Sequence, residues 1–154
     1  MVIGDWSLQE GGCRREVLFG REEDVMLHKM IAAINLVPED VYVTNCIKCC
    51  PGEGGIFDRE CEQSCYSFLN REISTVNPEV ICAMGEAAAR MLTGSRDMLV
   101  RIRGKFFPYC YHPSRSIAVM PTFHPRFLLR HPELKKATWT DLQAVMRRLQ
   151  GKRT

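Results

Sequence analysis

The sequence predicts an α/β protein in which helices cover both faces of a parallel sheet. Short, continuously apolar segments such as residues 80–84 and 117–120 are typical of strands buried on both faces. Segments with helical spacing of apolar residues separate them, and this alternation favours parallel strands joined by crossover helices. The chain has 154 residues, of which 45% are hydrophobic and 25% charged, which suits one folded domain and excludes a disordered chain.

The first half of the chain supplies two strands and two helices. Residues 2–3 are apolar and end at a glycine, which predicts a short strand. Residues 22–34 place apolar side chains near one helical face. Residues 41–44 form a second strand of β-branched and aromatic residues. Residues 58–76 predict a helix with an aspartate as its cap and an Asn-Pro pair as its stop.

The second half of the chain continues the alternation. Residues 80–84 predict a buried strand, and a glycine turns it into a helix over 86–92 that ends at a Thr-Gly pair. The basic and aromatic stretch 99–111 is expected to form an irregular hairpin. Residues 117–120 form another buried strand, and an amphipathic helix runs through 139–149.

Four expected strand ends carry polar or small residues, and ligands of parallel sheets bind outside the carboxyl ends of strands. These ends are Gly4-Asp5, Asn45, Gly85 and His124. The Asn45 amide offers both a donor and an acceptor to a ligand, although a structural turn amide is an alternative. The imidazole of His124 can donate a hydrogen bond or stabilise a developing anion, although an ordinary helix start is an alternative.

Charge is unevenly distributed along the chain. The net charge is +3, but residues 126–154 hold eight basic and two acidic side chains, and the rest of the chain is mildly acidic. A basic segment on an acidic body suggests an anionic partner, with a solvated amphipathic helix and basic tail as the alternative. Arg126 and Arg130 flank an apolar patch, and such a segment can enter a nucleic-acid duplex while its arginines hold phosphates.

Five of the eight cysteines lie within residues 46–65. Cys46 and Cys49 form a C-x2-C pair, and Cys61 and Cys65 form a C-x3-C pair. Four thiolates at such spacing are able to bind zinc or an iron–sulfur cluster, and the alternative is a set of reduced cysteines without metal.

No apolar run is long enough to cross a bilayer, and the first residues lack the pattern of a signal peptide. We therefore expect a cytoplasmic protein with no membrane partner.

Taken in order, five segments resemble the iron–sulfur family of bacterial and archaeal uracil-DNA glycosylases. They are residues 43–49 (V-T-N-C-I-K-C, family pattern T-N-x-x-K-C), 65–69, 77–88, 103–104 and 121–130. The last segment, with its T-F-H-P core, is the most specific, and the resemblance covers nearly the whole chain. It implies a three-layer α/β sandwich with a four-stranded parallel sheet between helices, formed as a single domain over residues 1–154.

The resemblance also implies base excision from uracil-containing DNA, with roles for residues at matching positions. Asn45 reads the edge of the uracil, and His124 steadies the leaving uracil anion. Gly85, at one of the four strand ends that define the expected site, is expected to contact the base. The segment after His124 enters the minor groove of DNA, which assigns DNA contacts to four residues: Arg126, Leu128, Leu129 and Arg130. The protein is expected to act as a monomer.

Three departures from the family pattern concern the cluster and the base pocket. Cys49 and Cys65 match two cluster ligands sixteen residues apart, but the other two lie upstream of the first strand in the family. Either the start is truncated or the 4Fe-4S cluster is absent, and Cys46 and Cys61 are alternatives that complete a four-cysteine site for a cluster or zinc.

The other two departures lie in the first loops. Asp5 stands where the family has a glutamate, and its acidic side chain is one methylene shorter. The expected catalytic role of Asp5 is to stabilise the sugar cation or to orient the water. Trp6 and Leu8 replace small residues and are able to fill the pocket. The family's stacking phenylalanine falls on Leu18, while Phe19 takes that place only if the register slips by one.

Three functions are therefore weighed from the sequence. The first is a glycosylase for uracil or another deaminated base. The second is a glycosylase-fold protein that binds DNA with little or no catalysis. The third is a metal-bearing interaction module without a base pocket.

Overall fold

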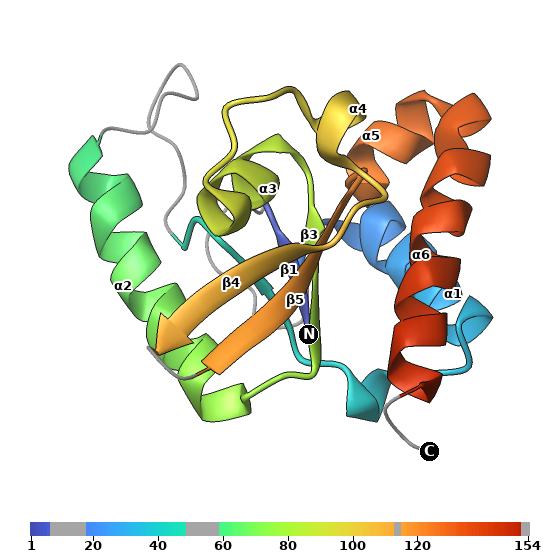
Figure 1. Ribbon diagram of the computed structural model, residues 1–154. Coiled ribbons are helices and arrows are strands. Elements are labelled where there is room, and N and C mark those ends of the chain that lie inside the picture. Colours follow the sequence, from blue (N-terminus) through green and yellow to red (C-terminus); the bar gives the residue numbers. More distant parts are fainter. Residues whose placement is uncertain (7–17, 49–58, 113–114, 152–154) are drawn as a thin grey trace.

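The computed structural model of the chain describes residues 1–6, 18–48, 59–112 and 115–151, with no side chains for 59–62 (Figure 1). The predictions made for Cys49 and Leu8 concern positions outside these residues, and the side chain of Cys61 also lies outside them.

A five-stranded sheet forms the centre of the molecule, in the order β2-β1-β3-β5-β4. Four strands are parallel, as the sequence predicts: β1 (Val2–Gly4), β2 (Val43–Asn45), β3 (Val80–Met84) and β5 (Arg115–Thr122). All five residues of β3 are buried, which explains its continuously apolar sequence. The α/β fold class is confirmed, and the sheet carries one strand more than expected.

The fifth strand, β4 (Phe107–His112), pairs antiparallel with β5 at the edge of the sheet. The sequence led us to expect an irregular hairpin here, and the segment instead contains helix α4 (Leu99–Ile102) followed by this regular strand. Pro108 has no backbone N–H to donate, and an edge strand tolerates that loss. The pairing is irregular only near Cys110 and His112, where the register shifts.

Helices α2 (Arg59–Val76) and α3 (Glu86–Thr93) cover one face of the sheet (Figure 1). Leu69 and Ile73 of α2 pack in a buried cluster with Ile3 and Ile81 of the sheet. Because Leu69 and Ile73 are four positions apart on α2, they share one side of the helix, and this apolar side faces the sheet.

Helices α1 (Arg21–Ala33) and α6 (Lys135–Gln150) cover the other face, which completes three layers. Leu27 and Ile31 of α1 and Leu142 and Val145 of α6 pack against the second side of the strands in another buried cluster. Every helix of the described residues is too short or too polar to cross a membrane.

A third buried cluster lies where α3, α4 and α5 (Pro125–Arg130) meet. It contains Leu99 and Ile102 of α4, Leu128 of α5, and Phe123 from the turn that follows β5. Two short 3-10 helices, Pro38–Asp40 and Pro132–Leu134, complete the described elements.

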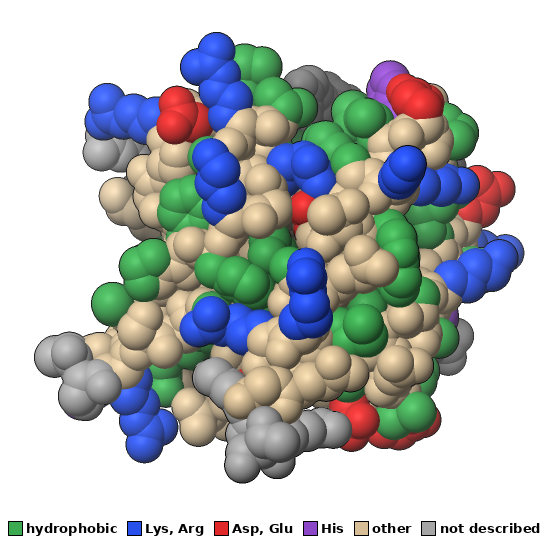
Figure 2. Space-filling view, turned by 45° about the vertical axis from the view of Figure 1, so that its right-hand side comes forward, with side chains coloured by type: hydrophobic (Ala, Val, Ile, Leu, Met, Phe, Trp, Pro, Cys, Tyr) green, Lys and Arg blue, Asp and Glu red, His purple; other side chains and the backbone are tan. Residues whose placement is uncertain are grey.

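Figure 2 shows the side on which α6 comes forward. Lysine and arginine side chains spread over this face with apolar side chains between them, rather than gathering in one patch.

Candidate active site

The sheet register brings four predicted site residues to one edge. Gly4 of β1 pairs with Asn45 on one side and with Met84 on the other, and Met84 pairs with Thr122. Asp5, Asn45, Gly85 and His124 therefore follow or end neighbouring strands at the same carboxyl edge. This arrangement is the one in which α/β sheets bind their ligands.

His124 is buried at the start of α5, and its ring is fixed in one orientation. Its Nδ1 accepts a hydrogen bond from the backbone N–H of Arg126 at 3.0 Å, so the proton of the neutral ring lies on Nε2. Burial, assisted by the charge of Arg126, lowers the pKa of His124 to about 3. The neutral imidazole thus presents one buried N–H, which has no partner among the described residues.

Asn45 also presents one unused polar atom. Its Nδ2 donates to the carbonyl oxygen of Leu18 at 2.8 Å. A carbonyl only accepts, so this bond fixes which way the amide points. The Oδ1 atom on the other side is buried and unpaired within the described ranges. The sequence led us to expect both halves of this amide to be available to a ligand, and the donating half is already bound to Leu18.

Phe19 lies between these two side chains. Its ring centroid is 4.6 Å from that of His124. Its ring atoms lie 2.4 and 2.7 Å from the position that a Cβ on Gly4 would take, and Asn45 Oδ1 lies 2.8 Å from that position. Phe19 is fully buried, whereas Leu18 is half-buried and packs with the second core cluster. Phe19, not Leu18, supplies the aromatic ring at this edge.

The backbone around Phe19 is held in place by Asp24 in the first turn of α1. Its carboxylate accepts the N–H groups of Leu18 and Phe19, each at 2.9 Å. Sequence reasoning missed this anchor, although an acidic residue at the start of a predicted helix is a recognisable signal for backbone capping.

Asp5 lies against the start of α3. Its Oδ1 accepts the backbone N–H of Ala88 at 2.8 Å, and its carboxylate packs against Gly85. A Cβ on Gly85 would lie 2.2 Å from Asp5 Oδ2, and the φ of +108° there also favours glycine. Burial raises the pKa of Asp5 to about 6, although backbone N–H groups of α3 and the charge of Arg126 oppose that rise.

A pocket of about 440 Å³ opens onto part of this site. Asp5, Gly85 and His124 line it, together with residues of α4 and with Phe123 and Phe127. Asn45 and Phe19 do not belong to its lining. The carboxylate and the imidazole are therefore accessible from the pocket, while the Asn45 oxygen is covered.

Arg126 lies elsewhere than expected for a DNA contact. Its guanidinium donates to the backbone oxygens of Phe19 at 3.1 Å and Trp6 at 3.3 Å, and forms an ion pair with Glu23 at 3.6 Å. The guanidinium also lies 6.0 Å from the Trp6 ring centre. Arg126 is thus turned inward and joins the first loop to α1, because its own helix starts beside these carbonyl groups.

The expected wedge residue Leu128 is also turned inward. It is 2% exposed and belongs to the cluster with Leu99 and Phe123, whereas Leu129 is half-buried and Arg130 is exposed. Helical spacing explains the difference, because Leu128 lies one turn after His124 on the inner side of α5. The exposed apolar side chain of this helix is Phe127, which belongs to the apolar patch between Arg126 and Arg130 that was expected from the sequence to enter a duplex.

The described cysteines do not assemble a metal site. Within these residues no group of three or more His, Cys, Asp or Glu side chains is placed to bind a metal. The Cys46 thiol donates to the Asp5 carbonyl at 3.2 Å, and burial raises its pKa, so it does not fit a thiolate ligand. Cys65 fits better, because its sulfur accepts the Lys48 N–H at 3.3 Å.

Fold and site together define an α/β protein with a buried polar ligand site at the carboxyl edge of its sheet. The profile of the uracil DNA glycosylase superfamily matches residues 1–143, and the chain belongs to this superfamily. The resemblance found in the sequence is thereby confirmed.

Curated relatives agree with this assignment. The chain is 29% identical to the Type-4 uracil-DNA glycosylase of Thermotoga maritima, over 93% of this chain and 80% of that protein. It is 27% identical to the Type-4 enzyme of Saccharolobus solfataricus, over 93% of this chain and 76% of that protein. It is also 27% identical to the Type-4 uracil-DNA glycosylase of Archaeoglobus fulgidus, over 88% of this chain and 77% of that protein.

Proposed function

We propose that this protein removes uracil from DNA by hydrolysing the N-glycosidic bond. The observation that carries the proposal is the pair of unpartnered polar atoms at one sheet edge, Asn45 Oδ1 and His124 Nε2, within the described part of the chain. A buried acceptor and a buried donor without partners are costly to the fold, and a ligand that pairs with both removes that cost.

The two atoms match the edge of uracil. Uracil carries an N–H at position 3 next to a carbonyl oxygen at position 2. Asn45 Oδ1 accepts from that N–H, and the Nε2–H of His124 donates to that oxygen. Cytosine has a lone pair at position 3, which would face the Asn45 oxygen. Because Leu18 holds the amide nitrogen, the amide does not turn to accept cytosine.

His124 also favours bond cleavage itself. Breaking the glycosidic bond leaves negative charge on the uracil, and a fixed donor in a water-poor site stabilises it. One such donor typically lowers a barrier by about 3–4 kcal/mol. The low pKa keeps the ring neutral, so the N–H is available at any pH above about 3.

Asp5 supplies the negative charge on the sugar side. It lines the pocket, and above a pH of about 6 it is a carboxylate. In that form it stabilises the positive charge that develops on the sugar, or orients the attacking water. Protonated Asp5 does neither, which makes excision dependent on pH.

Phe19 provides the aromatic face for the base. A base that reaches Asn45 displaces this ring, because the ring now lies beside the Asn45 oxygen. Taking the base out of the DNA stack costs a few kcal/mol, and stacking against an aromatic ring offsets part of that cost. Because the Phe19 ring covers the Asn45 oxygen, a second candidate function is also favoured, namely DNA binding with little excision of uracil.

An excision assay separates the two candidates. Wild-type protein is incubated with an oligonucleotide containing one uracil, and the abasic product is cleaved and counted. We expect His124→Ala to lower the single-turnover rate about 100- to 1,000-fold with DNA binding kept within twofold. Absence of excision by wild type, with DNA binding intact, would support the second candidate. Equal loss of excision and binding in His124→Ala would remove the assigned role.

We further propose that Cys65 binds an iron–sulfur cluster together with Cys49, with zinc as the alternative ion. The N–H bond to its sulfur supports a ligand role, since thiolate ligands are commonly hydrogen-bonded in this way. Metal analysis and the visible absorption spectrum of anaerobically purified protein test this. Cys65→Ser is expected to lose the metal, and a metal-free wild type would contradict the proposal.

We also propose that the protein acts on uracil-containing DNA as a monomer, as a single domain over residues 1–154, in the cytoplasm. Light scattering of the purified protein tests its monomeric state, and cell fractionation tests its compartment.

A further inference from the structure

Three aromatic rings form a ladder that leads from the pocket to the surface. Phe123 lines the pocket, and its ring centre is 5.2 Å from that of Phe127. The Phe127 ring is in turn 4.3 Å from the ring of His131. Phe123 is buried, Phe127 is 39% exposed, and the His131 side chain is 46% exposed. The ladder thus offers aromatic surface to a molecule that reaches Asp5 and His124.

A second apolar wall at the same pocket comes from α4. Met98 is 61% exposed and Val100 is 56% exposed, and both line the pocket with Phe127. Their neighbour Leu99 is buried, and its N–H donates to the Glu86 carboxylate at 3.2 and 3.3 Å, which ties α4 to the start of α3. The exposed side chains therefore stand on an anchored turn.

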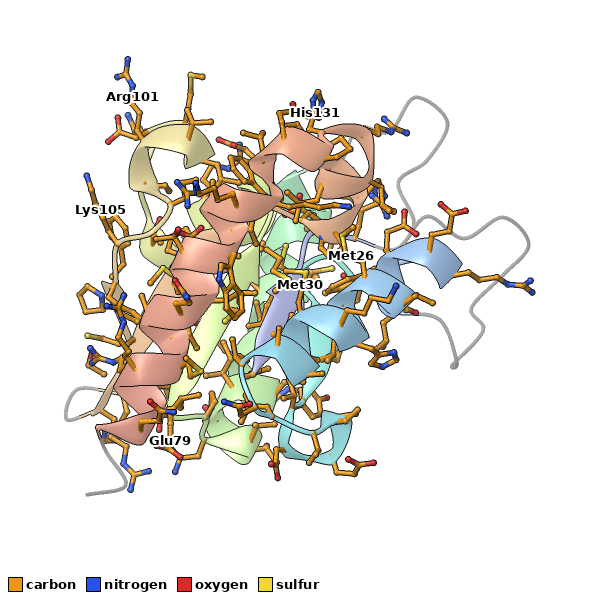
Figure 3. All side chains as sticks on the ribbon, turned by 90° about the vertical axis from the view of Figure 1, so that its right-hand side faces the viewer. Met26, Met30, Glu79, Arg101, Lys105 and His131 are labelled. Atoms are coloured by element: carbon orange, nitrogen blue, oxygen red, sulfur yellow. The ribbon has the colours of Figure 1, made fainter. Side chains whose placement is uncertain are left out.

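Basic side chains flank these apolar walls. Arg101 follows Val100 and is exposed, and Arg130 lies on the same helix as Phe127 and is exposed. Glu133 lies 3.4 Å from His131, and the acidic side chains Asp5 and Glu86 line the pocket itself. Figure 3 shows Arg101 and His131 at the carboxyl end of the sheet, the end opposite Glu79. Arginines beside aromatic rings are the combination that binds single-stranded nucleic acid.

We propose that the mouth of this pocket holds the nucleobase next to the excised one, with Phe127 and His131 on one wall and Met98 and Val100 on the other. The inference rests on the proposed function and specifies its substrate as single-stranded DNA. A duplex keeps that neighbouring base paired and stacked, whereas a single strand offers it freely. The burial of Leu128 agrees with this choice, because it removes one of the apolar side chains expected to open a duplex.

Binding to a short, uracil-free oligonucleotide tests the inference separately from excision. Phe127→Ala is expected to weaken single-strand binding about 5- to 150-fold, the loss typical of one base–aromatic stack. Binding to the matching duplex is expected to change less than twofold. Phe127→Leu keeps the apolar packing and is expected to lose the same single-strand affinity. It replaces Phe127→Ala in the test if that variant proves poorly folded.

Phe68 on α2 is the matched control, because it is an exposed phenylalanine at 53% with an arginine, Arg71, over its ring. Phe68→Ala is expected to leave single-strand binding unchanged. The proposal is overturned if Phe127→Ala and Phe127→Leu bind the single strand within twofold of wild type. It is also overturned if Phe68→Ala causes the same loss, or if duplex affinity falls equally. Failure of uracil excision leaves these outcomes unaffected.

Discussion

The hydroxyl of Thr122 donates a hydrogen bond to the carboxylate of Asp141 at 2.7 Å, which ties the end of β5 to α6 two residues before His124. Two guanidinium nitrogens of Arg103 donate hydrogen bonds to the same carboxylate, at 3.0 and 2.5 Å. Gly104 allows this approach, since its φ is +75° and a Cβ there would lie 2.8 Å from Asp141 Oδ1. Asp141 therefore fixes the strand end from which His124 projects.

Removing this carboxylate is expected to destabilise the protein and to disturb His124. Asp141 is 1% exposed, so Asp141→Ala leaves Arg103 without its buried partner, at a cost of about 3–5 kcal/mol in the free energy of unfolding. Urea unfolding measures this loss. Excision by the folded fraction is expected to fall as well, with Asp141→Asn between wild type and Asp141→Ala. A change in unfolding free energy below about 1 kcal/mol would contradict the anchoring role.

Gly4→Ala is expected to abolish excision, because its Cβ would lie within 2.4 Å of the Phe19 ring and 2.8 Å of the Asn45 oxygen. Overpacking of this kind costs about 1–3 kcal/mol of stability. Gly94→Ala is the control, since Gly94 has a φ of +67° and nothing within 4 Å of the added Cβ. It is expected to lower thermal stability without changing the excision rate. Equal excision by both variants would show that crowding at Phe19 does not matter.

Excision and the contribution of Asp5 to stability are expected to change in opposite directions with pH. Its pKa rises from 3.8 to about 6 on folding, so the folded protein keeps a proton that the unfolded chain loses between these values. The contribution of Asp5 to the free energy of unfolding therefore falls, by about 2–3 kcal/mol, as pH rises through this window. Excision rises over the upper part of the same window, because it requires the carboxylate.

Asp5→Asn separates this effect from that of other groups. The difference in unfolding free energy between wild type and the variant is measured at several pH values. A difference that stays constant between about pH 4 and 7 would rule out Asp5 as the titrating group. His124 acts with the opposite sign over the same pH range, because its pKa falls from 6.5 to about 3 on folding and only the unfolded chain binds that proton. The comparison of wild type with Asp5→Asn cancels this contribution, because both proteins contain His124.

Arg126 and Arg130 are expected to behave differently when each is replaced by alanine. Arg126 donates to two backbone oxygens inside the protein, so Arg126→Ala is expected to lower stability by about 1–3 kcal/mol and to leave the salt dependence of DNA binding unchanged. Arg130 is exposed, and Arg130→Ala is expected to reduce the slope of binding against salt by about 0.7–0.9. The opposite pattern in a salt titration would reverse these assignments.

The sequence predicted the layers well because hydrophobic spacing is a local property. The helix expected at 22–34 is Arg21–Ala33, and the strand expected at 80–84 has those bounds. The antiparallel strand Phe107–His112 escaped prediction because a proline within a short run is typical of a loop, and only the pairing with β5 shows it to be an edge strand.

Site geometry was less predictable, since it depends on which way side chains turn. Asn45 and His124 were placed at one edge by strand order alone, but the bond from Asn45 to Leu18 could not be inferred from spacing. Arg126 and Leu128 were expected outside and lie inside, because the packing of α5 against the first loop and α4 decides their direction.

The position of β1 between β2 and β3 has a consequence for synthesis of the chain. β2 follows β1 by some forty residues and β3 follows it by some eighty. During synthesis, Val2 and Ile3 therefore have no strand partner until the ribosome has made these later segments. At the usual rate of about 5–20 residues per second, that wait lasts about 4–16 s. Until β5 follows, a nascent chain has no imidazole beside its amide and is unable to hold a base.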